Sequence, residues 1–195
     1  MPGPELAVIG YGSLGACALG FDSDLDLIFL YQPVTSMSDG ARPVPAERYH
    51  TGVARRMLSL LSATTPSGRL YSIDARLRPN GRAGLLVSSI SAFSRYQSEE
   101  AWVWELQALT RARPIAGNAE TGEHFTAIRR EVLSKPRDEV TLRAEISAMR
   151  ERIRAEHRDG NPLKHGRGGL LDIEFVVQLG VLLNAENVPE VFAST

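Results

Sequence analysis

Two short apolar runs near the start of the chain, joined by a glycine turn, constrain its fold more than any other feature. The first run, Leu6–Ile9, ends at Gly10, and the second, Leu25–Tyr31, begins beside Asp24 and Asp26. Short apolar runs bounded by Gly, Ser and Asp predict buried strands. Because side chains alternate along a strand, Asp24 and Asp26 share one face. Two carboxylates there favour a bound cation, and Mg²⁺ is the preferred candidate because it takes one or two carboxylates together with phosphate oxygens.

The glycine turn supplies the other half of this candidate site. Gly12 and Ser13 follow the first strand and are expected to open a short helix. Backbone N–H groups at the start of a helix attract anions, and Gly12 allows the backbone to approach one closely. The Ser13 hydroxyl can add another donor. We therefore expect the turn to hold a triphosphate while the aspartates hold its metal.

This combination resembles the DNA polymerase β-like nucleotidyltransferase superfamily, whose pattern is Gly-Ser, a spacer, and Asp-hydrophobic-Asp-hydrophobic. The resemblance implies a third carboxylate on a later strand, for which the sequence offers Asp74. On that strand Arg76 and Arg78 are candidates to neutralise phosphate charge, because a guanidinium pairs well with phosphate oxygens.

Longer blocks are similar to one family, the glutamine synthetase adenylyltransferases (glutamate-ammonia-ligase adenylyltransferases). The chain departs from the family at Ser13, where the family often has Lys and the wider superfamily has Ser. The blocks that carry the resemblance are Gly10–Leu30, Asp74–Pro79, Ala101–Arg113 and Lys164–Phe175.

Composition narrows the class of protein. The net charge is −1 and the sequence has no basic stripe, so nothing favours a nucleic-acid substrate. Cys17 is the single cysteine, which excludes an internal disulfide and suits the cytoplasm. No apolar stretch is long enough for a membrane span. The histidines show no zinc-ligand spacing, and neither a nucleophile elbow nor a P-loop is present.

Further along the chain, periodicity predicts several elements. A loop at 32–45 precedes an amphipathic helix at 46–63, and strands are expected at 70–77 and 85–87. A mostly helical segment, 90–112, is expected to break near Gln97, with Trp102, Leu106 and Leu109 in its core stripe. Two charged helices follow, at 120–133 and 138–157, and then a strongly apolar helix at 170–186. Glycines before this last helix, with Lys164, suggest an anion-binding nest, although helix entry explains them equally well.

The expected fold is α/β (α+β): a DNA polymerase β-like nucleotidyltransferase domain with a mixed sheet at 1–115, followed by a partial helical domain at 116–195. Neither end of the chain resembles a domain border, and the family's proteins are much longer. We therefore expect a piece of a larger enzyme.

The resemblance implies transfer of AMP from MgATP to a tyrosine of glutamine synthetase, with a PII signalling protein and glutamine as regulators. Asp24 and Asp26 would bind Mg²⁺, two ions being expected in all, while Asp74 would bind the second and accept the tyrosine proton. The blocks favour the C-terminal, attaching half of the family's enzymes over the adenylyl-removing, phosphorolytic half. Other open alternatives are a nucleotidyltransferase with a different acceptor and a non-enzymatic regulatory piece. The roles of four further residues stay open: Glu105, Arg111, Asp172 and Glu174.

Overall fold

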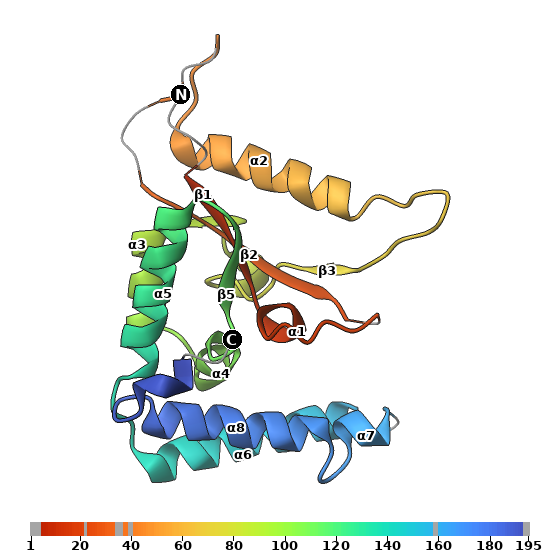
Figure 1. Cartoon of the computed structure of the whole chain (residues 1–195), viewed down its shortest axis with the longest axis vertical. Coiled ribbons are helices and arrows are strands. Elements are labelled where there is room, and N and C mark those ends of the chain that lie inside the picture. Colours follow the sequence, from red (N-terminus) through yellow and green to blue (C-terminus); the bar gives the residue numbers. More distant parts are fainter. Residues whose placement is uncertain (1–4, 22, 34–36, 39–40, 158–159, 193–195) are drawn as a thin grey trace. The chain divides into compact units, whose positions relative to one another are not determined.

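The computed structural model describes residues 5–21, 23–33, 37–38, 41–157 and 160–192. Within these ranges five strands form one mixed sheet, with β1 and β2 at its centre (Figure 1). β1 is antiparallel to β2 and β5, while β3 and β4 both run parallel to β2. The strands are β1 (Leu6–Gly10), β2 (Leu25–Tyr31), β3 (Ile73–Asp74), β4 (Val87–Ser89) and β5 (Arg113–Gly117).

The two predicted central strands are confirmed, and their burial explains why they form. Val8 and Phe29 are opposite each other in the β1–β2 register and are almost fully buried. On that face the amphipathic helix α2 (Ala46–Leu61) packs its Ala54 and Val53 against the strands. This helix confirms the expected segment at 46–63 and fixes which face of the sheet it covers.

The remaining helices follow the predicted periodicity closely. Ser89 caps α3 by accepting a hydrogen bond from the Ala92 N–H. The break in the long helical segment lies at 100–102, a few residues beyond the expected position. The other helices are α1 (Gly12–Gly15), α3 (Ile90–Glu99), α4 (Val103–Leu109), α5 (Ala119–Leu133), α6 (Glu139–Glu156), α7 (Pro162–His165) and α8 (Leu170–Asn184), with 3₁₀ turns η1 (Gly81–Ala83) and η2 (Pro189–Phe192).

Two expectations about local structure were wrong, and one strand was not expected. The strand predicted at 70–77 ends at Asp74, because the chain turns at once and Arg76 folds back onto that aspartate. β5 was missed because Pro114 and Gly117 both disfavour a strand by composition. Trp102, expected in the core, is 70% exposed as the N-cap residue of α4, whereas Leu106 and Leu109 are buried as predicted.

The chain forms two compact units. The first contains the sheet and comprises residues up to Ala101 together with Arg111–Ile128. The second is helical and comprises Trp102–Thr110 and residues from Arg129 onward. The domain division at 115 predicted from the sequence remains a prediction. Among the described residues, no helix has the length and apolar character needed to cross a membrane.

Candidate active site

Gly12 and Asp26 are in direct contact at one end of the sheet. The Tyr11 N–H donates to the backbone carbonyl of Asp26 at 2.9 Å. A Cβ on Gly12 would lie 2.2 Å from the Asp26 Oδ2, and the φ of Gly12 is +53°. The position therefore requires glycine both for its conformation and for the space that the carboxylate fills.

The third predicted carboxylate lies beside the second. In the parallel register of β2 and β3, Asp74 is the partner of Asp26, and the Leu25 N–H donates to the Ser72 carbonyl at 2.8 Å. Burial, followed by the charges of Asp74 and Asp24, raises the pKa of Asp26 to about 6. The structure thus brings Asp24, Asp26 and Asp74 together closely enough for their charges to interact.

The Asp74 carboxylate is held by Arg76. The Arg76 Nε donates to both carboxylate oxygens, at 2.8 and 2.7 Å, and Nη2 also contacts Oδ2. This pairing holds the pKa of Asp74 below its usual range, in contrast to that of Asp26. The two pKa shifts are opposite because burial dominates at Asp26, whereas the hydrogen bonds from Arg76 dominate at Asp74.

The other arginine proposed for phosphate binding, Arg78, has structural contacts instead. Its guanidinium donates to the backbone carbonyls of Ala75 and Gly84, which lie on either side of the turn that contains η1. These bonds hold the turn together after β3. Its assignment to nucleotide binding, like that of Arg76, stays a prediction.

Ser13 lies in a helix of a single turn, α1. Its backbone carbonyl accepts from the Ala18 N–H at 2.9 Å, and its side chain is half-buried. A four-residue helix has a weak macrodipole. Any phosphate binding here would therefore depend on individual N–H groups and the hydroxyl, and the role of Ser13 is a prediction.

Arg111, whose role stayed open from the sequence alone, lies close to the glycine turn. Gly15, the last residue of α1, lies so close to the Arg111 backbone that a Cβ would meet the Arg111 carbonyl oxygen at 2.1 Å. The charge of Arg111 counteracts the rise in the pKa of Asp26. No local motif reveals this proximity, because it depends on β5 pairing with β1.

The carboxylates fit a divalent cation by their chemistry. Three mutually repelling acidic groups, one with a raised pKa, gain from a cation between them. Within the described part of the chain, no three His, Cys, Asp or Glu side chains form a ready-made metal cluster. Mg²⁺ suits such a partial site, because it usually takes only one or two carboxylates and completes its shell with water and phosphate oxygens.

The glycine segment before α8 binds one of the protein's own carboxylates. The Gly168 N–H donates to the Asp172 Oδ2 at 2.6 Å, and the same carboxylate pairs with Arg150 at 2.5 Å. Asp172 thereby stabilises the start of its helix. Glu105 likewise caps a helix, accepting from the Trp102 N–H at 2.9 Å.

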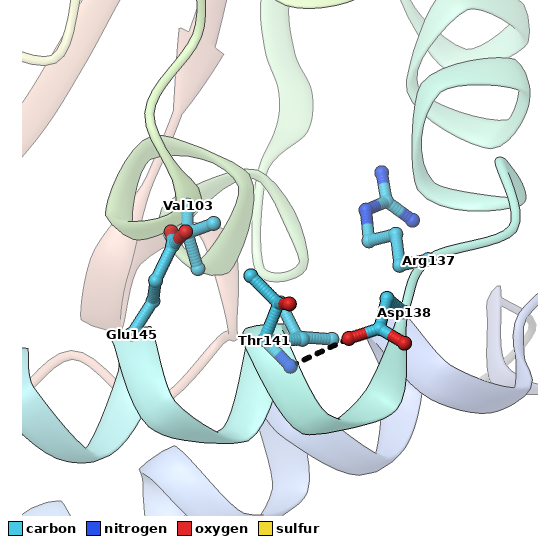
Figure 2. Close-up of a pocket in the computed structure, with 6 residues that line it drawn as sticks. Val103, Arg137, Asp138, Thr141 and Glu145 are labelled. Atoms are coloured by element: carbon cyan, nitrogen blue, oxygen red, sulfur yellow. Dashed lines mark hydrogen bonds between the residues drawn. The ribbon is translucent and has the colours of Figure 1, made fainter.

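A pocket of about 290 Å³ lies within the helical unit (Figure 2). Two of its charged groups have intramolecular partners: Asp138 accepts from the Thr141 N–H, and Arg137 donates to the carbonyls of Leu133 and Lys135. None of the predicted site residues lines it. Its lining residues are Val103, Arg137, Asp138, Thr141, Leu142 and Glu145.

Comparison with known proteins places these features in context. Residues 2–128 match the family model described as glutamate-ammonia ligase adenylyltransferase. The chain is also similar to the bifunctional glutamine synthetase adenylyltransferase/adenylyl-removing enzyme of Methylococcus capsulatus, with 49% identity over 188 residues. The match covers 93% of this chain and 20% of that protein, so the chain spans about a fifth of the relative's length.

Proposed function

Because this chain belongs to the glutamate-ammonia ligase adenylyltransferase family, we propose that it transfers AMP from MgATP to a tyrosine hydroxyl of glutamine synthetase. The observation that carries the proposal is the contact of Asp26 with the glycine turn, together with the pairing of Asp26 and Asp74 in the sheet. A site of this kind can position a nucleoside triphosphate and the metal cation that balances its negative charge.

In the proposed reaction, the tyrosine oxygen forms a bond to the α-phosphorus of ATP. The bond from that phosphorus to the oxygen bridging to the β-phosphate breaks, and pyrophosphate leaves with the electron pair. Asp24, Asp26 and Asp74 would hold Mg²⁺, for which we propose two ions. When bound, the metal supplies positive charge that stabilises the phosphoryl group in transfer.

Asp74 is the proposed acceptor of the tyrosine proton. A free tyrosine hydroxyl titrates near pH ~10, so deprotonation needs a positioned base. Arg76 binds this carboxylate and lowers its pKa, which makes it a weaker base. We therefore propose that Arg76 leaves Asp74 when the substrates bind.

The direction of the reaction is also a proposal. The relative's name includes both adenylyltransferase and adenylyl-removing activities. The sequences Gly10–Gly12, Asp74–Arg76 and Trp102–Leu109 resemble the attaching half, and this similarity supports attachment. Regulation by a PII protein and glutamine, and a cytoplasmic location, follow from the same proposal.

The test is an assay of the chain with α-labelled ATP, Mg²⁺ and unmodified glutamine synthetase. We expect label on glutamine synthetase, and no ADP when adenylylated glutamine synthetase is supplied with phosphate. Asp26→Asn should keep the fold and lose at least about 100-fold in rate, because ~1.4 kcal/mol of lost stabilisation is already tenfold. Phosphorolysis without attachment would reverse the proposed direction, and near-normal turnover of Asp26→Asn would contradict the site.

A further inference from the structure

We propose that the exposed segment 55–72, which leads from α2 to β3, binds the protein that carries the acceptor tyrosine. This inference rests on the proposed function and adds to it a docking surface, which meets an acidic and partly apolar face of glutamine synthetase beside that tyrosine. Its support comes from the exposed leucines of the segment, from its charge, from its shape, and from its attachment to the strand that carries Asp74.

Two leucines of this segment are among the most exposed apolar side chains of the unit that contains the sheet. Leu60 is 77% exposed and Leu70 is 76% exposed. Met57 and Leu58 pack against the sheet, whereas Leu60, near the end of α2, faces solvent. Exposed apolar side chains that gather in one segment favour contact with another protein. Leucine offers no ring on which the bases of a nucleic acid could stack.

The segment carries positive charge alone. Its arginines, Arg55, Arg56 and Arg69, are all exposed, and it contains no Asp or Glu, although the net charge of the whole chain is −1. Within the described part of the chain, none of these three side chains has an ion pair or a hydrogen bond. Arg56 and Leu60 are four residues apart in α2, so a charged and an apolar group share one side of the helix. Such a surface complements an acidic protein face that also offers apolar contacts.

The loop within the segment has a defined turn at its tip. The Thr65 N–H donates to the Gly68 carbonyl at 3.0 Å, and the Gly68 N–H donates to the Thr65 carbonyl at 2.9 Å. The Thr65 hydroxyl donates to the same Gly68 carbonyl at 2.9 Å. Figure 1 shows the loop extending away from the sheet before it returns to β3. A loop that already has its shape loses less conformational entropy when it binds a partner.

The segment ends at the carboxylate site. The Leu25 N–H donates to the Ser72 carbonyl at 2.8 Å, and Asp74, the proposed proton acceptor, is two residues further along the chain. Leu70 therefore precedes Asp74 by only four residues. A protein bound along the segment has its surface next to Asp74, where the proposed reaction needs the tyrosine hydroxyl, and holding the two groups near each other favours the transfer.

The experiment measures steady-state AMP transfer with α-labelled ATP. The concentration of unmodified glutamine synthetase is varied at saturating MgATP, and the concentration of ATP is varied at saturating glutamine synthetase. One test variant combines Arg55→Glu with Arg56→Glu, and the other is Leu70→Ser. These positions are exposed and lie outside the carboxylate site, so the chemistry of the site is left intact.

Each test variant has a matched control in the helical unit. Arg130→Glu combined with Arg152→Glu reverses the charge of two arginines that are also exposed and helical. Val140→Ser removes an apolar side chain that is 76% exposed, as Leu70 is. The controls therefore change net charge and surface hydrophobicity by similar amounts at other positions.

We expect the double arginine variant to raise the KM for glutamine synthetase about tenfold, because it replaces attraction to an acidic face by repulsion. Added salt should raise this KM for the unmodified chain and change it little for the variant. Leu70→Ser should raise the same KM about threefold, as the loss of one apolar contact at an interface does. In both variants kcat and the KM for ATP should be unchanged, and both controls should behave like the unmodified chain.

An unchanged KM for glutamine synthetase in both test variants would overturn the inference, while the measured transfer would leave the proposed function in place. A rise in the KM for ATP instead, or equal losses in the controls, would overturn it too. Binding of a labelled oligonucleotide that the double arginine variant alone loses, with an unchanged KM for glutamine synthetase, would assign the surface to a nucleic acid.

Loss of the cooperative thermal transition in both test variants would show a structural role and would likewise overturn the inference. An unmodified chain that transfers no AMP to glutamine synthetase would contradict the proposed function itself.

Discussion

At the scale of single residues, two glycines that have no side chain are as important to the site as its aspartates. Gly12 has no side chain, and the Asp26 carboxylate fills the space where one would begin. Gly15 is restricted in the same way by the Arg111 carbonyl. The two glycines therefore allow the Asp26 side chain and the Arg111 backbone to pack directly against the turn.

Gly12→Ala should lower both activity and stability. The new methyl group would overlap Asp26 Oδ2, and alanine disfavours the φ of +53°. We expect a loss of about 1–3 kcal/mol of unfolding free energy and at least a tenfold loss in AMP transfer. Urea unfolding and the transfer assay would measure the two effects.

Gly52→Ala is the matched control for this change. Gly52 lies in α2, and a Cβ there would meet no atom within 4 Å. Replacing it should stabilise the chain by about 0.5–1 kcal/mol and leave transfer unchanged. If the two variants behaved alike, the contact between Gly12 and Asp26 would have no special importance.

Asp172→Asn should change how stability depends on pH. The Gly168 N–H, and then Arg150 and Arg154, hold the pKa of Asp172 below its ordinary value. A carboxyl with a lowered pKa in the folded state stabilises it above its unfolded pKa, near ~3.9, and loses that contribution as the pH falls through the folded value. The unmodified chain should therefore lose stability in acid below pH ~4, and Asp172→Asn should show a flatter acid limb.

The same variant should also be less stable at neutral pH, because it leaves the buried Arg150 without its carboxylate. Glu139→Gln is the control, since the Glu139–Arg143 pair is exposed on both sides and such pairs contribute little. Thermal melts from pH 3 to 7 would compare the three chains. A similar pH profile for the unmodified and Asp172→Asn chains would show that Asp172 does not contribute to the loss of stability in acid.

At the scale of secondary-structure elements, the helix caps explain where several helices begin. Ser89, Asp138 and Asn161 each accept a hydrogen bond from a backbone N–H two or three residues ahead. Each thereby satisfies one N–H that the first helical turn leaves unpaired. At Ser89 the cap also ends β4, so one residue closes a strand and opens α3.

Ser89→Ala should destabilise the chain by about 1 kcal/mol, the usual contribution of a cap. Ser89→Asn keeps an acceptor at the same position and should recover most of this loss. Denaturant unfolding of both variants would measure the difference. Equal stabilities for the alanine and asparagine variants would mean that the hydroxyl does not act as a cap.

Some elements could be predicted from the local sequence and others could not, and the difference has a physical cause. The strands around Gly12, Asp24 and Asp26 were predictable because burial and turn chemistry act over a few residues. β5 was not, because its pairing with β1 overrides the poor strand propensity of Pro114 and Gly117. The position of Arg111 depends on that same pairing, so only the folded chain reveals it.

At the scale of the whole molecule, the helical unit exposes an apolar stripe along α8. Leu170, Ile173, Val176 and Val177 are each more than half exposed, at helical spacing. Stripes of this kind on a protein surface favour association. Neighbouring copies of the chain can cover them in concentrated solution.

We therefore expect the isolated chain to self-associate with rising concentration. The double variant Ile173→Lys and Val176→Lys should remain monomeric, whereas Val140→Lys, at an exposed position of α6, should associate like the unmodified chain. Light scattering across a concentration series would measure this. A monodisperse monomer at all concentrations would disprove it.

Because β3 is very short, we expect the segment that carries Asp74 to separate from β2 more often than the rest of the sheet opens. Two residues pair β3 with β2, so the strand that carries Asp74 has few bonds to hold it closed. Segments with few protecting contacts open far more often than the core around them. In hydrogen–deuterium exchange, the Leu25 amide, which donates to Ser72, should exchange much faster than the amides between Ile28 and Leu30. Bound MgATP should slow the exchange of the Leu25 amide selectively. The exchange rate of this one amide would then report whether the strand that carries Asp74 stays paired with β2 when the substrate is bound.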